Sequence, residues 1–296
     1  MHRGIYIVAN DKVIDNAIAL LNSIRLFDPE VLVYLIPFNE NYHNIFDKLS
    51  TLHNVKLFPN LELIEQFTKR ISEIFDGDFL ALPNKMRKLV TWFGPLDEFI
   101  YIDTDIVVFE KIADNLDKLS EVDFFCCDYH HANDKLRNIF SPLVQEQQIF
   151  AETQLEDVFN SGFWASKKGA ITEEQMDATL RECAAHREYF DFSEGVTDQP
   201  ILNYLVLKLI PKRGNLVKIP GGGAGSWAGS RNFQQQGYAL YDRGQPLKYI
   251  HWAGIKIKAN SPYWELWEYY RYLHEGKFAF IPKLTRRLFP FVTAHT

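Results

Sequence analysis

The sequence predicts an α/β protein with a mainly parallel central sheet flanked by helices. Short runs of β-branched and apolar residues, typical of strands buried on both faces, recur at 5–8, 31–36, 55–58 and 99–102. Segments with apolar residues at helical spacing separate these runs. Such alternation builds β-α-β units with right-handed crossovers, and ligands of such sheets gather at the carboxyl ends of the strands.

Each element of the first half has its own signal. The run at 5–8 ends at Asn10-Asp11, and Pro37 ends the run at 31–36. Helices are expected at 14–24, 42–52, 61–75 and 82–93. Leu82-Pro83-Asn84 marks the start of the last of these helices, and Gly94-Pro95 stops it.

The second half continues the pattern less regularly. Strands are expected at 122–126, 159–165 and 249–250, and helices at 172–189 and 198–208. The glycine-rich segment Gly221 to Gly225 is expected to be a mobile loop that closes over a site. There is no convincing linker before about residue 260, so the sequence predicts one domain followed by a helical, aromatic tail.

Composition limits the function. The chain has 296 residues and a net charge of −6, which argues against nucleic acid as a partner, since polyanion binders need a surplus of Lys and Arg. Its three cysteines, Cys126, Cys127 and Cys183, form no spaced framework, which favours a reduced, cytoplasmic setting. No secretory signal and no segment long enough to span a membrane is visible.

Asp103-Thr104-Asp105 is the strongest local signal for chemistry. Side chains two apart in an extended segment lie on one face, so both carboxylates can reach one hard cation. The spacing alone is weak evidence, because the chain repeats it at Asp76-Gly77-Asp78. Only Asp103 and Asp105 follow a buried strand, whereas Asp76-Gly77-Asp78 has the pattern of a surface turn.

Five ordered segments covering most of residues 5–258 resemble glycosyltransferase family 8, whose members include glycogenin and bacterial lipopolysaccharide galactosyltransferases. They are Ile5 to Asp11, Lys88 ahead of Phe99 to Asp105, Phe159 to Gly162, Asp198 to Asn203, and His251 to Gly254. Each is short, but their order and spacing together are specific. The resemblance implies a GT-A fold. From the pattern of elements along the chain, we expect residues 1–260 to form this catalytic domain and residues 261–296 a helical tail packed on it.

The resemblance also implies a metal site and its ligands. Asp103 and Asp105 would bind Mn²⁺, and His251 would be the third protein ligand. An imidazole beside two carboxylates suits manganese better than magnesium, which remains the alternative.

Substrate contacts follow from the same resemblance. The residues that contact the base, ribose or diphosphate would be Asn10, Asp11, Lys88 and Thr104. Those near the transferred sugar would be Asp157, Asn160 and Asp198, with Gln199 beside the anomeric carbon. Two departures stand out. Val13 replaces a tyrosine that stacks on uracil, and Ile257 replaces a lysine, leaving Lys256 or Lys258 for the diphosphate.

Some of these residues also have purely structural explanations. His251 could be a satisfied strand-end histidine, Lys88 a solvated helix residue, and Asp198 a helix N-terminal carboxylate followed by Pro200. Cys126 and Cys127 do not form a zinc site, because adjacent strand residues point to opposite faces. Asp128, which follows the predicted strand 122–126, is a candidate for the acceptor side.

The sequence therefore predicts a metal-dependent transfer of a hexose from a nucleotide-diphosphate sugar, with UDP-sugar expected, to a glycan or glycolipid hydroxyl. The resemblance implies retention. A nucleotidyltransferase of similar fold and a catalytically silent carbohydrate-binding protein are the alternatives. Aromatic and basic residues in the tail, among them Trp264, Trp267 and Arg271, suit peripheral contact with the inner membrane face if the acceptor is lipid-linked.

Overall fold

The computed structural model of the protein describes residues 1–80, 82–127, 136, 138–193, 195, 197–219, 223–230 and 232–275. Within these residues a seven-stranded sheet forms the centre, in the order β3-β2-β1-β4-β7-β6-β8. Its strands are β1 (Arg3–Ala9), β2 (Leu32–Pro37), β3 (Lys56–Leu57), β4 (Glu98–Ile102), β6 (Phe124–Cys126), β7 (Phe163–Lys167) and β8 (Arg213–Asn215). The pairs β3-β2, β2-β1, β1-β4 and β6-β8 are parallel, and β7 is antiparallel to both its neighbours. The predicted α/β architecture with a mainly parallel sheet is confirmed.

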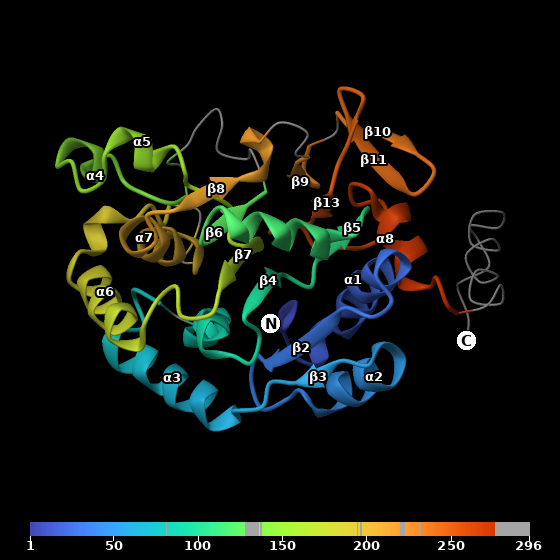
Figure 1. The fold of residues 1–296 in the computed structure, drawn as a ribbon, viewed down its shortest axis with the longest axis horizontal. Coiled ribbons are helices and arrows are strands. Elements are labelled where there is room, and N and C mark those ends of the chain that lie inside the picture. The colour runs from blue at the N-terminus through green and yellow to red at the C-terminus, as the bar shows by residue number, and fades with distance from the viewer. Residues whose placement is uncertain are drawn as a thin grey trace, which may run out of the picture.

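Helices lie around this sheet (Figure 1). They are α1 (Ile14–Phe27), α2 (His43–His53), α3 (Leu61–Ile74), α4 (Leu143–Glu146), α5 (Glu152–Leu155), α6 (Glu173–Ala185), α7 (Gln199–Leu209) and α8 (Trp264–Arg271). None of the helices in the described ranges is both long enough and apolar enough to cross a membrane.

Two small sheets complete the fold. One has the order β5-β13-β9 and consists of β5 (Ile106–Val108), β13 (Tyr249–His251) and β9 (Gly225–Trp227). The other consists of β10 (Gln234–Gln236), β11 (Ala239–Asp242) and β12 (Gln245–Pro246). The β5-β13-β9 sheet matters for function, because β5 begins four residues after β4 ends and pairs with a strand from far along the chain.

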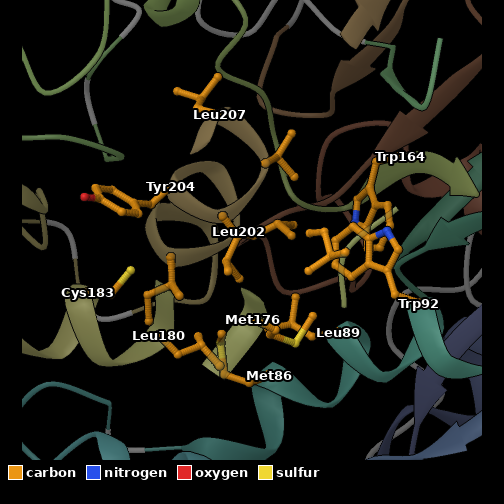
Figure 2. Close-up of a cluster of buried hydrophobic side chains, with 14 of the residues drawn as sticks. Met86, Leu89, Trp92, Trp164, Met176, Leu180, Cys183, Leu202, Tyr204 and Leu207 are labelled. Carbon is orange, nitrogen blue, oxygen red and sulfur yellow. The ribbon is translucent and has the colours of Figure 1, made fainter. Parts of the chain in front are cut away.

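Helix α7 is buried on nearly all sides. Every residue from Pro200 to Leu207 is buried, as expected for a helix that is apolar all round. Figure 2 shows Leu202 of α7 facing side chains of α6 and of the segment that contains Met86 and Leu89. This packing fixes the position of the N-terminus of α7, where Asp198 and Gln199 lie.

Helix α8 packs on α1, near the other end of the chain (Figure 1). The buried amide of Asn22 donates to the carbonyl of Tyr270 at 2.7 Å. The guanidinium of Arg271 pairs with Asp15 at 2.6 Å. The segment 276–296, which holds the remaining basic residues of the predicted tail, lies outside the described residues.

Three predicted elements need correction. Residues 83–93 form a 3₁₀ helix, Pro83–Phe93, instead of an α-helix. The strand expected at 159–165 begins only at Phe163, because residues 159–162 are held by side chains of α7 instead of a neighbouring strand. The helix expected at 172–189 is α6 followed by a separate 3₁₀ turn, Arg187–Tyr189. Gly221 and Gly222 of the predicted mobile loop lie outside the described residues.

Candidate functional site

Asp103, Asp105 and His251 meet at the carboxyl end of β4. The Nε2 atom of His251 lies 3.1 Å from Oδ1 of Asp105 and 3.9 Å from Oδ2 of Asp103. One potential ligand atom from each residue lies within 4.8 Å of the other two. Among the described residues, these three side chains form the one group of at least three His, Cys, Asp or Glu residues that are close enough to share a metal ion. Sequence positions 146 residues apart therefore form one cluster.

Backbone pairing between β5 and β13 builds this cluster. The two strands are antiparallel with His251 opposite Ile106, and the N–H of Trp252 donates to the carbonyl of Asp105 at 3.0 Å. On the other side, the N–H of Asp103 donates to the carbonyl of Gly162 at 2.8 Å. Both aspartates thus have their backbones fixed by segments distant in sequence.

Gly162 is required by close approach. A Cβ atom at this position would lie 2.3 Å from Cε1 of His251 and 3.0 Å from Oδ2 of Asp103. Non-bonded atoms do not approach as closely as 2.3 Å. A side chain at position 162 would therefore push the imidazole of His251 away, and only glycine lets it lie this close to Asp103.

Lys88 and Tyr101 support Asp103 from within the protein. The buried ammonium of Lys88 lies 2.8 Å from Oδ2 of Asp198 and 3.4 Å from Oδ1 of Asp103, and it also donates to the carbonyl of Ser161. The hydroxyl of Tyr101 donates to the same Oδ1 of Asp103 at 2.5 Å. Lys88 also stands over the Tyr101 ring, 4.6 Å from its centroid. Lys88 therefore joins β4 to the start of α7 and is not a solvated helix residue.

The electrostatics of the cluster follow from burial and from these contacts. Burial lowers the pKa of Lys88, but Asp103 and Asp198 outweigh it and the pKa is raised. Burial raises the pKa of Asp103, and the nearby charge of Asp105 adds to this against the effect of Lys88.

Asp105 and His251 shift each other's pKa in opposite directions. Burial raises the pKa of Asp105, but the neighbouring His251 outweighs it, and the net pKa lies below the ordinary value. Burial lowers the pKa of His251, and Asp105 and Asp103 together raise it above the ordinary value. The cluster thus favours ionised Asp105 beside a positive partner, a role that an imidazolium or a cation can fill.

The loop 159–162 is fastened to α7 by amide side chains. Asn203, fully buried, accepts the N–H of Phe159 at 2.9 Å and donates to its carbonyl at 2.8 Å. Oε1 of Gln199 accepts the N–H of Ser161 at 3.2 Å. Oδ1 of Asn160 accepts the N–H of Gly162 at 3.0 Å. The predicted residues Asn160, Asp198 and Gln199 therefore belong to one connected framework around Lys88.

Asn10 and Asp11 lie at the carboxyl end of β1, next to β4 in the sheet. Oδ1 of Asn10 accepts the N–H of Lys12 at 3.1 Å, and Oδ1 of Asp11 accepts the N–H of Ile45 at 2.7 Å, in the first turn of α2. Both side chains therefore cap local structure. Thr104, which is 9% exposed, lies in the turn between β4 and β5.

Asp157, Lys256 and Lys258 have other surroundings. Asp157 pairs with Arg213 at 3.1 Å and with Lys218 at 3.4 Å. Lys256 and Lys258 are exposed in the segment after β13, and neither forms an ion pair with a carboxylate in the described ranges. Asp128 lies outside the described residues. The roles expected for these four residues stay predictions.

Tyr101, Gly162 and Asn203 are site residues that the sequence reasoning missed. Tyr101, Asp103 and Asp105 alternate, and this spacing places side chains of an extended segment on one face, so it could have indicated the hydroxyl. Gly162 and Asn203 fall inside two of the five family-like segments. Their roles depend on contacts with His251 and Phe159, which spacing alone does not reveal.

The arrangement of Asp103, Asp105 and His251 fits a divalent cation. Neighbouring ligands of an octahedral ion with bonds of about 2.1–2.2 Å stand roughly 3 Å apart, close to the separation of Nε2 of His251 and Oδ1 of Asp105. The raised pKa of Asp103 reflects the burial of two carboxylates near each other, an arrangement that a cation would stabilise. Imidazole with carboxylates favours Mn²⁺ over Mg²⁺.

Comparisons with known proteins support the fold. No protein-family model matches the sequence. The uncharacterized protein YfnF of Bacillus subtilis (strain 168) is 22% identical over 253 residues, 81% of this chain and 78% of YfnF.

Three solved structures are similar over nearly the whole chain. The bifunctional glycosyltransferase WbbM is 15% identical with a TM-score of 0.63, and the match covers 97% of this chain and 51% of WbbM. The galactosyltransferase LgtC, in complex with donor and acceptor sugar analogues, is 12% identical with a TM-score of 0.63, covering 90% and 95% of the two chains. An active-site variant of LgtC with glutamate in place of glutamine is 13% identical with a TM-score of 0.60, covering 91% and 94%. The chain therefore has the GT-A fold of these glycosyltransferases and spans about half the length of WbbM.

Proposed function

We propose that this protein transfers a hexose from a nucleotide-diphosphate sugar, a UDP-sugar by preference, to a hydroxyl of a glycan or glycolipid. The convergence of Asp103, Asp105 and His251 at the carboxyl end of β4 carries the proposal. In an α/β sheet this edge receives the ligand. The GT-A fold shared with LgtC, which was solved with donor and acceptor sugar analogues, supports the same reaction class.

Asp103, Asp105 and His251 would hold Mn²⁺ or, as the alternative, Mg²⁺. A bound divalent cation neutralises the negative charge that develops on a departing nucleotide diphosphate. The protein contributes the placement of these ligands, because Tyr101, Lys88 and the β5-β13 pairing fix them before any substrate binds. Asn10, Asp11 and Thr104 would lie towards the base and ribose, with Lys256 or Lys258 near the diphosphate.

Asp198 and Gln199 would face the transferred sugar. Asp198 is ion-paired with Lys88, and this pairing lowers its pKa against the effect of burial. A carboxylate neutralised in this way is suited to accepting hydrogen bonds from sugar hydroxyls and is a poor nucleophile. Gln199 is a neutral amide fixed by the N–H of Ser161, and it would lie beside the anomeric carbon.

These features support transfer with retention by front-face attack. The acceptor hydroxyl would form its bond on the face that the diphosphate leaves, and a diphosphate oxygen would take the hydroxyl proton. The anomeric coupling constant of the first product formed tests this step, and an inverted product contradicts it.

A panel of nucleotide sugars tests the function itself. With Mn²⁺, at least one UDP-sugar should release free UDP, and EDTA should abolish the release. Absence of release from every nucleotide sugar in the panel would instead favour a protein that binds carbohydrate without catalysis. Formation of a nucleotide sugar from a nucleoside triphosphate and a sugar phosphate would indicate a nucleotidyltransferase.

A further inference from the structure

Trp227 stands beside the cluster of Asp103, Asp105 and His251, and part of its side chain is exposed to solvent. It is the last residue of β9, and 41% of its surface is accessible. Trp252, which follows the adjacent strand β13, is fully buried. A single exposed aromatic ring needs no explanation by itself, so the case for Trp227 depends on its position beside His251 and on the contacts that fix its ring.

The register of the small sheet places Trp227 next to His251. Strands β9 and β13 are parallel, with Gly225 opposite Tyr249 and Trp227 opposite His251. Paired residues of neighbouring strands point to the same face of a sheet, about 4.8 Å apart. The contact at the first pair confirms this direction, because a Cβ on Gly225 would lie 1.8 Å from the ring of Tyr249. Trp227 and His251 therefore project from one face.

The indole of Trp227 is fixed in one orientation. Its Nε1–H donates to the carbonyl of Ala253 at 2.9 Å. A Cβ on Gly229 would lie 2.2 Å from Cη2 of the ring, so the glycine backbone lies directly against the benzene part of the indole. A ring held at its nitrogen and supported on one side loses little conformational freedom when a ligand stacks on it.

The position of β9 favours the acceptor over the nucleotide. The proposed contacts for the base and ribose, Asn10 and Asp11, follow β1, which lies on one side of β4 in the sheet order. Strand β9 is tied to the other side of β4, since the N–H of Gly225 donates to the carbonyl of Cys127 at 2.9 Å, directly after β6. Trp227 thus lies across the cluster from the expected nucleotide.

We infer that Trp227 forms a stacking subsite for a pyranose ring of the acceptor, placed one strand away from the metal ligand His251. The axial and ring C–H groups of a pyranose present an apolar face, which is complementary to the π-face of an indole. The inference rests on the proposed function, because it places the sugar beside the proposed transfer site. It adds the acceptor's chemical class, a pyranoside that binds through one ring face.

Indole NMR tests the subsite without knowledge of the natural acceptor. Protein labelled with ¹⁵N at the indole nitrogens, with Mg²⁺ and UDP present, is titrated with methyl β-D-galactopyranoside, methyl β-D-glucopyranoside and methyl α-D-mannopyranoside. The Trp227 resonance, identified by its loss in Trp227→Phe, should shift and saturate with at least one of them. If none of the three shifts it, the inference is overturned.

Variants separate stacking from a general structural effect. Ligand-detected NMR should show about tenfold weaker binding of that pyranoside to Trp227→Ala and near-normal binding to Trp227→Phe, which keeps an aromatic ring. Tyr238→Ala removes another exposed ring, one that stacks on Tyr269, and should leave binding unchanged. Equal binding to Trp227→Ala and the wild type would also overturn the inference. Metal-dependent UDP release by the wild-type protein is measured separately. A failure of the proposed function would appear as absent UDP release, whereas a failure of the subsite would appear as unchanged indole shifts.

Discussion

Two segments of this protein carry a pair of aspartates separated by one residue, and they have different surroundings. Asp76, Gly77 and Asp78 are all exposed, and both the side chain and the carbonyl of Asp76 accept the N–H of Phe79. That segment is a turn after α3. Asp103 and Asp105 instead flank the turn between β4 and β5, where Lys88, Tyr101 and His251 contact their carboxylates.

The difference lies in the long-range partners. The contacts of Asp76 are local, to the N–H groups of residues three and four positions on. The carboxylates of Asp103 and Asp105 reach partners 15 and 146 residues away. A pair of carboxylates thus becomes a candidate metal site only where the fold brings a third ligand and fixes the first two.

The largest effect is expected from Asp105→Asn, with Asp78→Asn as the matched control. The amide keeps the size of the carboxylate but loses its charge, so UDP release in the presence of Mn²⁺ should fall about a thousandfold. Asp78 is exposed in its turn, and its variant should keep wild-type release. Initial rates over a series of Mn²⁺ concentrations measure both. Wild-type rates in Asp105→Asn would contradict the metal assignment.

Glycines give the second pair of variants, Gly162→Ala and Gly77→Ala. The new methyl group at 162 would stand 2.3 Å from Cε1 of His251 and must displace the imidazole. A displacement of about 1 Å costs on the order of a hundredfold in rate, and Mn²⁺ affinity measured by calorimetry should fall with it. At Gly77 no atom lies within 4 Å of the added Cβ, so that variant should behave as the wild type. If both variants bind Mn²⁺ equally well, the close approach at Gly162 has no functional role.

Tyr101→Phe tests the support beneath Asp103 and should have a smaller effect. Removing the hydroxyl deletes one hydrogen bond to Oδ1 of Asp103 and leaves the ring under Lys88. Loss of such a supporting contact typically weakens metal binding about tenfold. Tyr6→Phe is the control, because the Tyr6 hydroxyl accepts the buried N–H of Leu96. Tyr6→Phe should lower the unfolding temperature without changing Mn²⁺ affinity. If Tyr101→Phe left Mn²⁺ affinity unchanged while Tyr6→Phe weakened it, the supporting role of Tyr101 would be refuted.

The two aspartate pairs also show how far the sequence could predict this protein. A buried strand leading into Asp103 was enough to separate this pair from Asp76-Gly77-Asp78, because strand ends and turns have local signals. The position of His251 depended on resemblance, since the strand that pairs with β13 is only three residues long and was not predicted. Short strands gain their stability from pairing and not from their own composition, so sequence patterns identify them poorly.

Functional residues that act through shape were the hardest to predict. Gly162 has no side chain to suggest chemistry. Its importance comes from its close approach to the imidazole of His251, which lies 89 positions further along the chain. Asn10 and Asp11 show the converse. Their residue types suggested ligand contacts, and the structure shows that both also cap local elements.

The smallest expected effect concerns His53 and His251, two buried histidines that differ as the aspartate pairs do. His251 has carboxylate partners that raise its pKa, whereas burial, helped by Arg25, lowers the pKa of His53 to about 4. No described residue forms a hydrogen bond with Nε2 of His53.

A folded-state pKa below the ordinary value of about 6.5 means that the unfolded chain binds the proton more tightly, so His53 lowers stability as the pH falls through 6.5. Between pH 7.5 and pH 6 this should amount to about 0.8 kcal/mol. His53→Leu should remove that part of the pH dependence, measured as the difference in free energy of unfolding by urea at the two pH values. An unchanged difference in His53→Leu would show that His53 is protonated in the folded protein as easily as in the unfolded chain, and the contrast with His251 would then be lost.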